Sequence, residues 1–547
     1  MAQTCYVCKY TPTELLKALG GDPVLLDRAP ENFELADQVA HPNLCGFGKG
    51  VIQAVRAGGI KELVLVNCCD TIRSAYDILL EYGDLDFLYL LDLLHGADGC
   101  SVDHARDQLM DLAEAYAAYK GTEFDPAAFF AAFDPYTPAK GPHIAVLGAH
   151  MGRELFQMVE KAMPLPAENA TCANNRSVAK PEEETDFAAL MTAYARTLLG
   201  QLPCMRMTDK TARRALYNDP DLAGVVYHTI KFCDYYGFEY ADVKEKLTVP
   251  VLKIESDGTR QSEGQLRTRL EAFAEGLAPA DAPVKKNAGG KGYYAGVDSG
   301  STTTDVVILD KDRQMVAKVI LPTGAGAEKG AARALEEALA QAGLTEADLT
   351  ATVTTGYGRT AIDLGDKSVT EITCHARGAH FLNPDVRTVI DIGGQDSKVI
   401  RLDDRGGVAS FVMNDKCAAG TGRFLEMMAK TLELSLEEIS TIGLQWKEEI
   451  TISSMCTVFA DSEVVSLGAR NKALPDIVHG LNNSVASRAA ALFRRVKGEP
   501  VCMMTGGVAR NAGVVKAIEG ALDLPLFIHE DAQVCGALGA ALFAADL

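Results

Sequence analysis

Three glycine-rich turns, each following an apolar strand, limit the folds open to the C-terminal half of this chain. Residues 294–309 (YAGVDSGSTTTDVVIL) and 388–401 (TVIDIGGQDSKVIR) each predict a strand, a tight polar turn and a second strand. Residues 503–511 (MMTGGVARN) place two glycines after a third strand. Each segment alone also fits an ordinary hairpin or turn. All three in this order predict an α/β domain whose backbone N–H groups and hydroxyls bind a phosphate chain.

The turns also carry candidate catalytic residues. Asp298 can hold Mg²⁺ through water, Asp391 repeats its position in the second hairpin, and Gln395 can orient a water molecule. The candidate nucleotide-binding residues are Gly300, Ser301, Thr302 and Thr303 in the first turn, Gly393 and Gly394 in the second, and Gly506 and Gly507, which allow close approach to an adenosine.

Two cysteines in this half each precede a predicted helix. Cys417 is followed by Gly420 and Gly422, which we add to the candidate cofactor-binding residues, and then by an apolar helical pattern; Cys456 repeats this layout. A thiolate at a helix N-terminus meets unpaired N–H groups and the positive end of the helix dipole. Both interactions favour the thiolate form, so they lower the pKa of the cysteine and make it a suitable metal ligand. The alternative for each is a small buried apolar residue.

The N-terminal half alternates strands with helices, which predicts parallel sheets covered on both faces. Cysteines recur just after strand ends, where ligands of open α/β sheets gather. A segment rich in proline, charge and glycine, residues 279–292, predicts a linker. We therefore predict two lobes of one domain at 1–140 and 141–278, the linker at 279–292, and a separate α/β domain at 293–547.

Composition excludes several kinds of partner. The longest apolar run, residues 85–94, is too short for a bilayer, and the N-terminus lacks the features of a secretion signal, so we expect a cytoplasmic protein without membrane contact. The net charge of −21 repels nucleic acid, which we also exclude as a partner. In that compartment the 14 cysteines indicate metal binding rather than disulfides.

The C-terminal half resembles the actin-like (ribonuclease H-like) ATPase superfamily, and within it the activators of 2-hydroxyacyl-CoA dehydratases and the ATPase subunits of benzoyl-CoA reductase. The resemblance lies in GVDSGSTTTD, TTGYGR, EITCHARGA, DIGGQDSK, KCAAGTGRFLE, SMCTVFADSEV and TGGVARN. It implies ATP hydrolysis with Mg²⁺ and one [4Fe-4S] cluster bound by Cys417 and Cys456 from each of two subunits. In that family, ATP turnover changes the angle between the two cysteine-headed helices and releases an electron at low potential.

The residues agree with this stoichiometry, because two thiolates per chain are half of a Cys₄ site. Cys374 and Cys502 lie in apolar patterns and Cys535 opens a helix rich in glycine and alanine, so we expect all three in the core. A symmetric homodimer sharing one cluster is then the simpler solution.

The N-terminal half resembles the iron–sulfur subunits of 2-hydroxyacyl-CoA dehydratases and the double-cubane-cluster proteins, through NLCGFGKG, VNCCDTIRS, ATCANNR, LPCMRMT and IKFCD. The resemblance implies that Cys45, Cys69 and Cys233 bind a [4Fe-4S] cluster, with Cys172 and Cys204 as further ligands of the double-cubane type. Cys100 is a weaker sixth candidate. We expect Cys68 to point away and assign no role to Cys5 and Cys8.

Together these features predict an ATP-driven electron donor fused to its iron–sulfur acceptor. Reduced ferredoxin or flavodoxin would supply electrons, and an acyl-CoA or another small molecule would receive them. The acceptor domain is shorter than a usual dehydratase subunit and occurs once, whereas dehydratases pair two different subunits around the acyl-CoA. Two other functions stay open: a small-molecule kinase of the same superfamily, and a non-catalytic sensor with a structural metal site.

Overall fold

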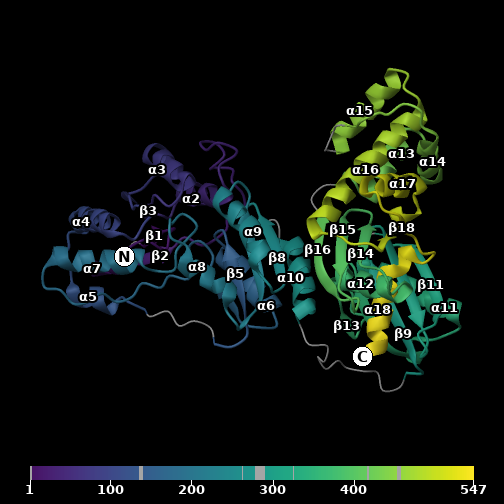
Figure 1. Ribbon diagram of the computed structural model, residues 1–547, viewed down its shortest axis with the longest axis horizontal. Helices are drawn as coiled ribbons and strands as arrows, with labels where there is room; N and C mark the ends of the chain where they lie inside the picture. Colours follow the sequence, from purple (N-terminus) through teal and green to yellow (C-terminus); the bar gives the residue numbers. More distant parts are fainter. Residues whose placement is uncertain are drawn as a thin grey trace. The chain divides into compact units, whose positions relative to one another are not determined.

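The computed structural model describes residues 3–134, 140–260, 263–277, 290–324, 326–414, 418–452 and 457–547. The chain divides into two compact units, Met1–Leu277 and Ala278–Leu547, which we call unit 1 and unit 2. Both units combine β-sheets with packed helices (Figure 1). The fold class is therefore α/β throughout, as predicted.

Unit 1 contains two parallel sheets. Among its described residues the strand orders are β2-β1-β3-β4 and β6-β5-β7-β8, and every neighbouring pair runs parallel. The central strands are apolar and almost entirely buried, because helices cover both faces. The strands are β1 (Thr4–Tyr6), β2 (Pro23–Leu25), β3 (Glu62–Val66), β4 (Phe87–Leu91), β5 (His143–Gly148), β6 (Ala167–Asn169), β7 (Leu222–Ile230) and β8 (Val251–Ser256). The helices are α1 (Thr13–Ala18), α2 (Gly46–Arg56), α3 (Asp70–Tyr82), α4 (Gly99–Lys120), α5 (Pro126–Ala131), α6 (Arg153–Ala162), α7 (Phe187–Leu199), α8 (Thr211–Ala215), α9 (Asp234–Lys246) and α10 (Glu263–Leu277), with the short helix η1 (Leu216–Asn218).

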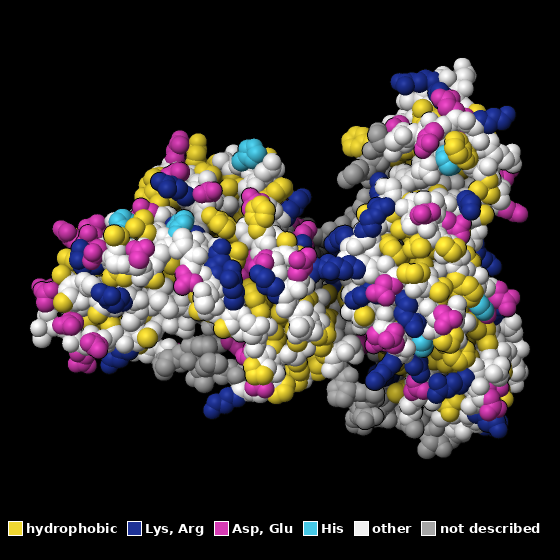
Figure 2. Space-filling model, in the orientation of Figure 1, with side chains coloured by type: hydrophobic (Ala, Val, Ile, Leu, Met, Phe, Trp, Pro, Cys, Tyr) yellow, Lys and Arg dark blue, Asp and Glu magenta, His cyan; other side chains and the backbone are white. Residues whose placement is uncertain are grey.

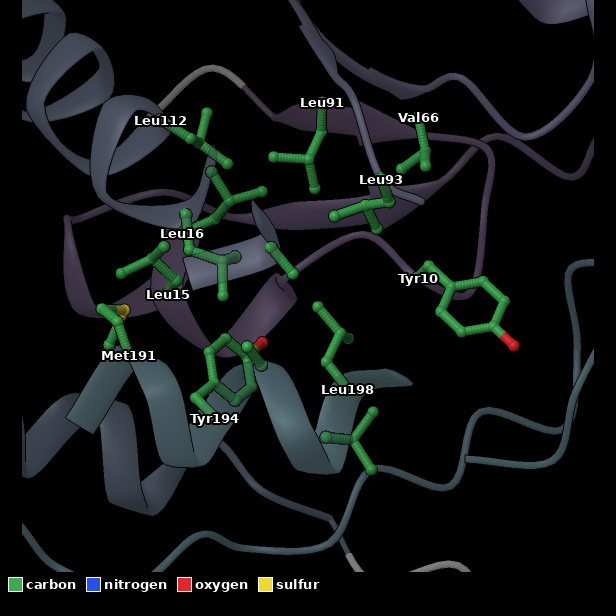
Figure 3. Packing of buried hydrophobic residues seen from close by; sticks show 14 of the residues in the cluster. Tyr10, Leu15, Leu16, Val66, Leu91, Leu93, Leu112, Met191, Tyr194 and Leu198 are labelled. Atoms are coloured by element: carbon green, nitrogen blue, oxygen red, sulfur yellow. The ribbon is translucent and has the colours of Figure 1, made fainter. Parts of the chain in front are cut away.

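One helix of unit 1 packs far from its neighbours in sequence. Helix α7 follows β6 of the second sheet, yet its apolar face lies against α1, α4 and the first sheet. Figure 3 shows Met191, Tyr194 and Leu198 of this helix beside Leu15 and Leu16 of α1. The segment after β6 therefore completes the core of the first sheet.

Unit 2 repeats one sheet topology twice. Among its described residues the orders are β11-β10-β9-β12-β13 and β16-β15-β14-β17-β18. In each sheet the first three strands in sequence are antiparallel, and the last two run parallel to the central strand. This duplicated arrangement confirms the predicted actin-like fold. The strands are β9 (Tyr293–Ser299), β10 (Thr303–Leu309), β11 (Met315–Pro322), β12 (Leu349–Thr355), β13 (Lys367–Ser368), β14 (Thr388–Ile392), β15 (Ser397–Leu402), β16 (Val408–Asn414), β17 (Cys502–Thr505) and β18 (Leu526–Phe527). The helices are α11 (Ala327–Ala342), α12 (Glu371–Leu382), α13 (Gly422–Thr431), α14 (Leu436–Ile442), α15 (Thr457–Ala469), α16 (Leu474–Val496), α17 (Ala512–Leu522) and α18 (Cys535–Asp546), with the short helices η3 (Glu346–Asp348), η4 (Arg359–Ala361), η5 (Gly443–Gln445), η6 (Gly507–Arg510) and η7 (Ala532–Val534).

Helices α12 and α18 pack tightly against each other beside β9. A Cβ at Gly539 of α18 would lie 1.8 Å from the carbonyl oxygen of Cys374 in α12, so only glycine allows this approach. Cys374, Cys502 and Cys535 are all buried, which confirms that they belong to the core. The close packing places the first turn of α12 next to the end of β9.

The surface carries charges of both signs. On the face shown in Figure 2, acidic and basic side chains are interspersed over both units. Among the described helices, none is both long and apolar enough to span a membrane.

Candidate functional site

The first two glycine turns meet in unit 2. The amide of Gly300 donates to the carbonyl of Thr303 over 2.9 Å, and Gly393 donates to Asp396 over 3.0 Å, so both hairpins turn tightly. A Cβ at Gly394 would lie 2.2 Å from Thr302 Oγ1, and glycine is therefore required where the turns approach. The structure brings the predicted residues of both turns to one place.

A histidine lies between the two predicted aspartates. His375, on α12, has Nε2 3.8 Å from Asp298 Oδ2 and Nδ1 3.6 Å from Asp391 Oδ1. The hydroxyl of Thr505, at the end of β17, donates to Asp391 Oδ1 over 2.9 Å. The His375 side chain thus connects β9 and β14, the central strands of the two sheets of unit 2.

A buried lysine joins the second hairpin to α12. Lys398 Nζ lies 2.9 Å from Asp396, 3.4 Å from Asp391 and 3.5 Å from Glu371. These carboxylates raise the pKa of Lys398 well above its usual range, although burial opposes this. The lysine therefore stays charged within the carboxylate group.

The acidic groups outnumber the cations around them. Burial raises the pKa of Asp298 well above its ordinary value, with Asp305 and Glu371 adding to the shift. Burial also raises the pKa of Asp305 to about 7. The pKa of Asp391 is lowered despite burial, because His375 and Lys398 stabilise its charge. Such a site favours a cation, which would relieve the repulsion between carboxylates.

Several buried polar atoms in and around these turns have no hydrogen-bond partner among the described residues. They are Ser299 Oγ, Thr302 Oγ1, Asp305 Oδ1, Thr355 Oγ1 and Glu371 Oε2. Orphaned buried atoms of this kind are costly, and a phosphate chain with hydrated Mg²⁺ would satisfy them. Among the described residues, no three metal-ligating side chains stand close enough to hold an ion directly. The residues present therefore fit Mg²⁺ held through its own water molecules.

The remaining predicted nucleotide residues differ in their surroundings. Gly506 directly follows β17 and has a φ of +81°, and a Cβ there would lie 2.8 Å from Asp391 Oδ1. Gly507 is exposed, and a Cβ on it would meet no atom within 4 Å. Gln395 is also exposed, at the tip of the second turn. Gly506 thus borders the carboxylate group, whereas Gly507 faces open space.

The second turn is bonded to the start of α13. The amide of Gly422 donates to Gly393 over 2.8 Å, and that of Arg423 donates to Gly394 over 2.9 Å. Gly420, with φ of +97°, precedes this contact beside Arg488. Cys417 and Cys456 themselves lie outside the described residues.

Helices α13 and α15 are linked in turn. The hydroxyl of Thr431, the last residue of α13, donates to Asp461 of α15 over 2.6 Å. Helix α15 begins at Thr457, directly after Cys456. A side-chain hydrogen bond therefore joins α13 and α15, the helices that follow these two cysteines in the sequence.

The thiols of unit 1 include three that each precede a helix. Cys45, Cys69 and Cys233 are the residues immediately before α2, α3 and α9. Burial raises the pKa of Cys233 to about 12, and Cys45 and Cys69 raise it further by their proximity. The structure thus brings together three predicted ligands at three positive helix ends, which favour thiolates.

A second thiol group contains a residue that the sequence did not point to. Burial raises the pKa of Cys172 well above its usual value, and the neighbouring thiols of Cys204 and Cys8 contribute. Cys8 is buried just after β1 rather than on a flexible chain end, and its thiol lies near those of Cys172 and Cys204. The sequence did contain a signal for Cys8: it comes just after a strand end, as the other candidate ligands do.

Cys68 links the two groups. Its thiol lies beside those of Cys8 and Cys69 and lowers the pKa of each of them. The expectation that Cys68 points away was therefore wrong. Cys100 is exposed on α4, and Cys5 is buried within β1 among apolar side chains. No three of the described thiols could hold a single metal ion, but a cubane cluster holds its cysteines farther apart than one ion does.

A cavity in unit 1 adjoins the first thiol group. Its lining includes Gly46 and Phe47, which follow Cys45, together with His150, which lies just after β5, and with His228 and Ser256 on strands of the second sheet. The Nδ1–H of His228 donates to the carbonyl of Ala149 over 3.2 Å, and its Nε2 accepts from the Ser256 hydroxyl over 2.9 Å. Burial lowers the pKa of His228 to about 4 and that of His150 to about 3. The cavity therefore offers neutral polar groups to a small molecule.

Sequence reasoning assigned no role to Glu371, His375, Lys398 or Thr505. The motif EITCHARGA contains the first two, spaced four residues apart on one helical face. That spacing was the available signal for His375 and Glu371. Sheet pairing places Lys398 and Thr505 beside Asp391, and the packing of α12 brings Glu371 and His375 to them.

Comparisons with known proteins match each half separately. The profile of the BadF/BadG/BcrA/BcrD ATPase family matches residues 295–544, and that of the 2-hydroxyglutaryl-CoA dehydratase D-component matches residues 8–140 and 131–277. The activator of lactoyl-CoA dehydratase from Anaerotignum propionicum is 49% identical over 252 residues, covering 46% of this chain and 97% of the relative. The (R)-2-hydroxyglutaryl-CoA dehydratase activating ATPase from Acidaminococcus fermentans is 45% identical over 253 residues. That match covers 46% of this chain and 96% of the relative.

A solved structure is also similar in sequence. The activator of 2-hydroxyisocaproyl-CoA dehydratase from Clostridium difficile with bound ADPNP is 44% identical, covers 46% of this chain and 94% of its own, and has a TM-score of 0.45. Through its C-terminal half the chain belongs to the BadF/BadG/BcrA/BcrD ATPase family, and its N-terminal half matches the dehydratase D-component.

Proposed function

We propose that this protein uses ATP hydrolysis in unit 2 to drive an electron at low potential into unit 1. The observation that carries the proposal is the pair of hydrogen bonds from Gly422 and Arg423 to the second glycine turn. They connect the predicted phosphate site to the segment that follows Cys417. A change at the nucleotide would therefore be transmitted to a candidate metal ligand.

In this proposal Cys417 and Cys456 of two chains hold one [4Fe-4S] cluster in a homodimer, because each chain supplies half of a Cys₄ site. When bound, such a cluster supplies one-electron transfer. The chain's own part is mechanical: Gly393 and Gly394 respond to the nucleotide, α13 follows them, and the Thr431–Asp461 hydrogen bond passes the change to α15.

Unit 1 provides the acceptor. Cys45, Cys69 and Cys233 would hold one cluster at three helix N-termini, and Cys8, Cys172 and Cys204 would hold a second or the other half of a double-cubane cluster. Reduced ferredoxin or flavodoxin would supply the electron. The cavity beside Cys45 gives a place for a small-molecule substrate or the reacting end of an acyl-CoA.

The proposal requires ATP and ADP to stabilise different conformations of α13, because a ligand shifts an equilibrium only by its differential affinity. We expect amide hydrogen exchange in residues 418–431 to differ between the protein with ADP and with a non-hydrolysable ATP analogue. The exchange of α11, which packs on β9, β10 and β11 of the other sheet, serves as the internal control. Identical protection of α13 in both states would contradict the coupling.

A second prediction concerns the thiols of unit 1. Cys8→Ser should lower the iron and sulfide content of anaerobically purified protein, because Cys8 lies with Cys172 and Cys204. Cys5→Ser is the matched control: Cys5 is also buried near the N-terminus but belongs to the apolar core around β1. We expect the control to keep its iron. Equal iron in both variants would remove Cys8 from the ligand set.

A further inference from the structure

Two tyrosine hydroxyls are buried beside the second thiol group, which consists of Cys8, Cys172 and Cys204. Neither hydroxyl, of Tyr10 or of Tyr236, has a hydrogen-bond partner among the described residues. Tyr10 is 3% exposed and belongs to the same apolar cluster as Cys8 and Cys204. Tyr236 is also 3% exposed, and Cys172 packs against its cluster. Because a buried hydroxyl without an acceptor is costly, the two tyrosines indicate that this group holds an acceptor.

The sulfurs of an iron–sulfur cluster held by these cysteines fit the missing acceptor. A phenol keeps its proton at neutral pH and can donate a hydrogen bond. Tyr236 lies beside the thiol of Cys172, and Tyr10 lies beside the backbone of Cys204, so each is near a different candidate ligand. A neutral thiol is a weak acceptor, whereas the sulfurs of a cluster carry negative charge and accept hydrogen bonds.

A buried lysine brings positive charge to the same place. Lys9 is 1% exposed, and its Nζ donates to the carbonyl of Leu202. Among the described residues no carboxylate forms an ion pair with it, and the groups that favour its charge are the thiols of Cys204, Cys172 and Cys8. A buried cation needs a counter-charge, which an anionic cluster at this group would supply.

The first thiol group has the opposite surroundings; it consists of Cys45, Cys69 and Cys233. Asp70 and Asp234 begin α3 and α9, directly after two of these cysteines, and they disfavour negative charge on them. A helix end contributes about half a positive charge, whereas each carboxylate carries a full negative one. At the second group Lys9 and Arg206 act on the thiols instead. An added electron is therefore more stable at the second group.

We propose that Tyr10 and Tyr236 donate hydrogen bonds to the sulfurs bound at the second thiol group and, with Lys9, make it the higher-potential metal site of unit 1. The electron that enters unit 1 then rests there. The centre of unit 2 loses one electron and the second group gains one, no covalent bond changes, and both phenols keep their protons. This inference rests on the iron–sulfur acceptor of the proposed function and adds where in unit 1 the electron is held.

The test is the reduction potential of unit 1, measured by a redox titration followed by electron paramagnetic resonance. The full chain is used with Cys417→Ser, so that a cluster of unit 2 does not contribute. Tyr10→Phe removes only the hydroxyl and should lower the equilibrium constant for reduction about tenfold, which is about 59 mV for one electron. The reason is that a donor stabilises the more negative, reduced state. Tyr236→Phe should shift the potential in the same direction.

Tyr116→Phe is the matched control. Tyr116 is fully buried in the same apolar cluster as Tyr10, but its hydroxyl is hydrogen-bonded to Thr4 and Glu62 rather than lying beside a thiol. Its potential should equal that of the parent. Iron content should stay the same in all three variants, because none of them removes a ligand.

An unchanged potential in Tyr10→Phe or Tyr236→Phe would overturn the inference, as would an equal shift in Tyr116→Phe. If Tyr10→Phe does not fold, Tyr236→Phe decides by the same criterion. ATP-driven reduction of an acceptor dye by the parent protein is measured separately. A parent that shows the tyrosine shifts without reducing the dye would contradict the proposed function while supporting the inference, and a unit 1 without iron would overturn both.

Discussion

Cys417→Ser is expected to remove the iron shared between two chains and to abolish ATP-driven reduction while leaving ATP binding unchanged. A [4Fe-4S] cluster bridging a homodimer corresponds to about two irons per chain, so the anaerobically purified variant should lose about that amount of iron and sulfide. Serine is a poor replacement because the thiolate is the ligand. Metal analysis, electron paramagnetic resonance and nucleotide binding measure the three quantities.

Cys100→Ser provides a control, because Cys100 is exposed on α4 of unit 1, whereas Cys417 belongs to unit 2. Its iron content and reduction rate should match those of the parent. Iron unchanged by Cys417→Ser would eliminate the bridging cluster. The two rival functions give other patterns: a kinase would be colourless and active in both variants, and a sensor would keep its cluster in one redox state through many ATP turnovers.

Glu239→Gln is expected to destabilise unit 1 by about 3–5 kcal/mol, the usual cost of removing one partner of a buried ion pair. The Arg213 guanidinium, which is 1% exposed, donates to both oxygens of Glu239. The hydroxyls of Tyr217 and Tyr227 donate to the same carboxylate over 2.7 and 2.6 Å. Glutamine can keep the tyrosines but leaves the guanidinium without a counter-charge.

Urea unfolding followed by tyrosine fluorescence measures this loss, because the single tryptophan lies in unit 2. Asp242→Asn is the matched control on the same helix: Asp242 pairs with Lys246 one turn away at the exposed surface. Salt and water screen such a pair, so its loss should leave the midpoint unchanged within error. Equal midpoints for Glu239→Gln and the parent would show that the buried pair contributes little.

Local sequence chemistry was enough for several features. Tight turns such as DSGSTT and DIGGQD predict hairpins because glycine and hydroxyl residues act within a few positions of themselves. The apolar runs around Cys374 and Cys502 correctly placed both in the core, since burial follows from the local pattern. The alternation of strands and helices was likewise enough to predict the parallel sheets of unit 1.

Contacts between distant segments were decided only by the tertiary structure. Cys8 lies with Cys172 and Cys204, more than 160 residues later, and α7 returns to the core around α1 and α4. Glu371 meets Lys398 through the packing of α12 against the second hairpin. A hydrophobic period says which face of an element is buried, but it does not say which other element covers that face. The physical reason is that pairing between elements depends on the shape and packing of the whole core, which no short stretch of sequence contains.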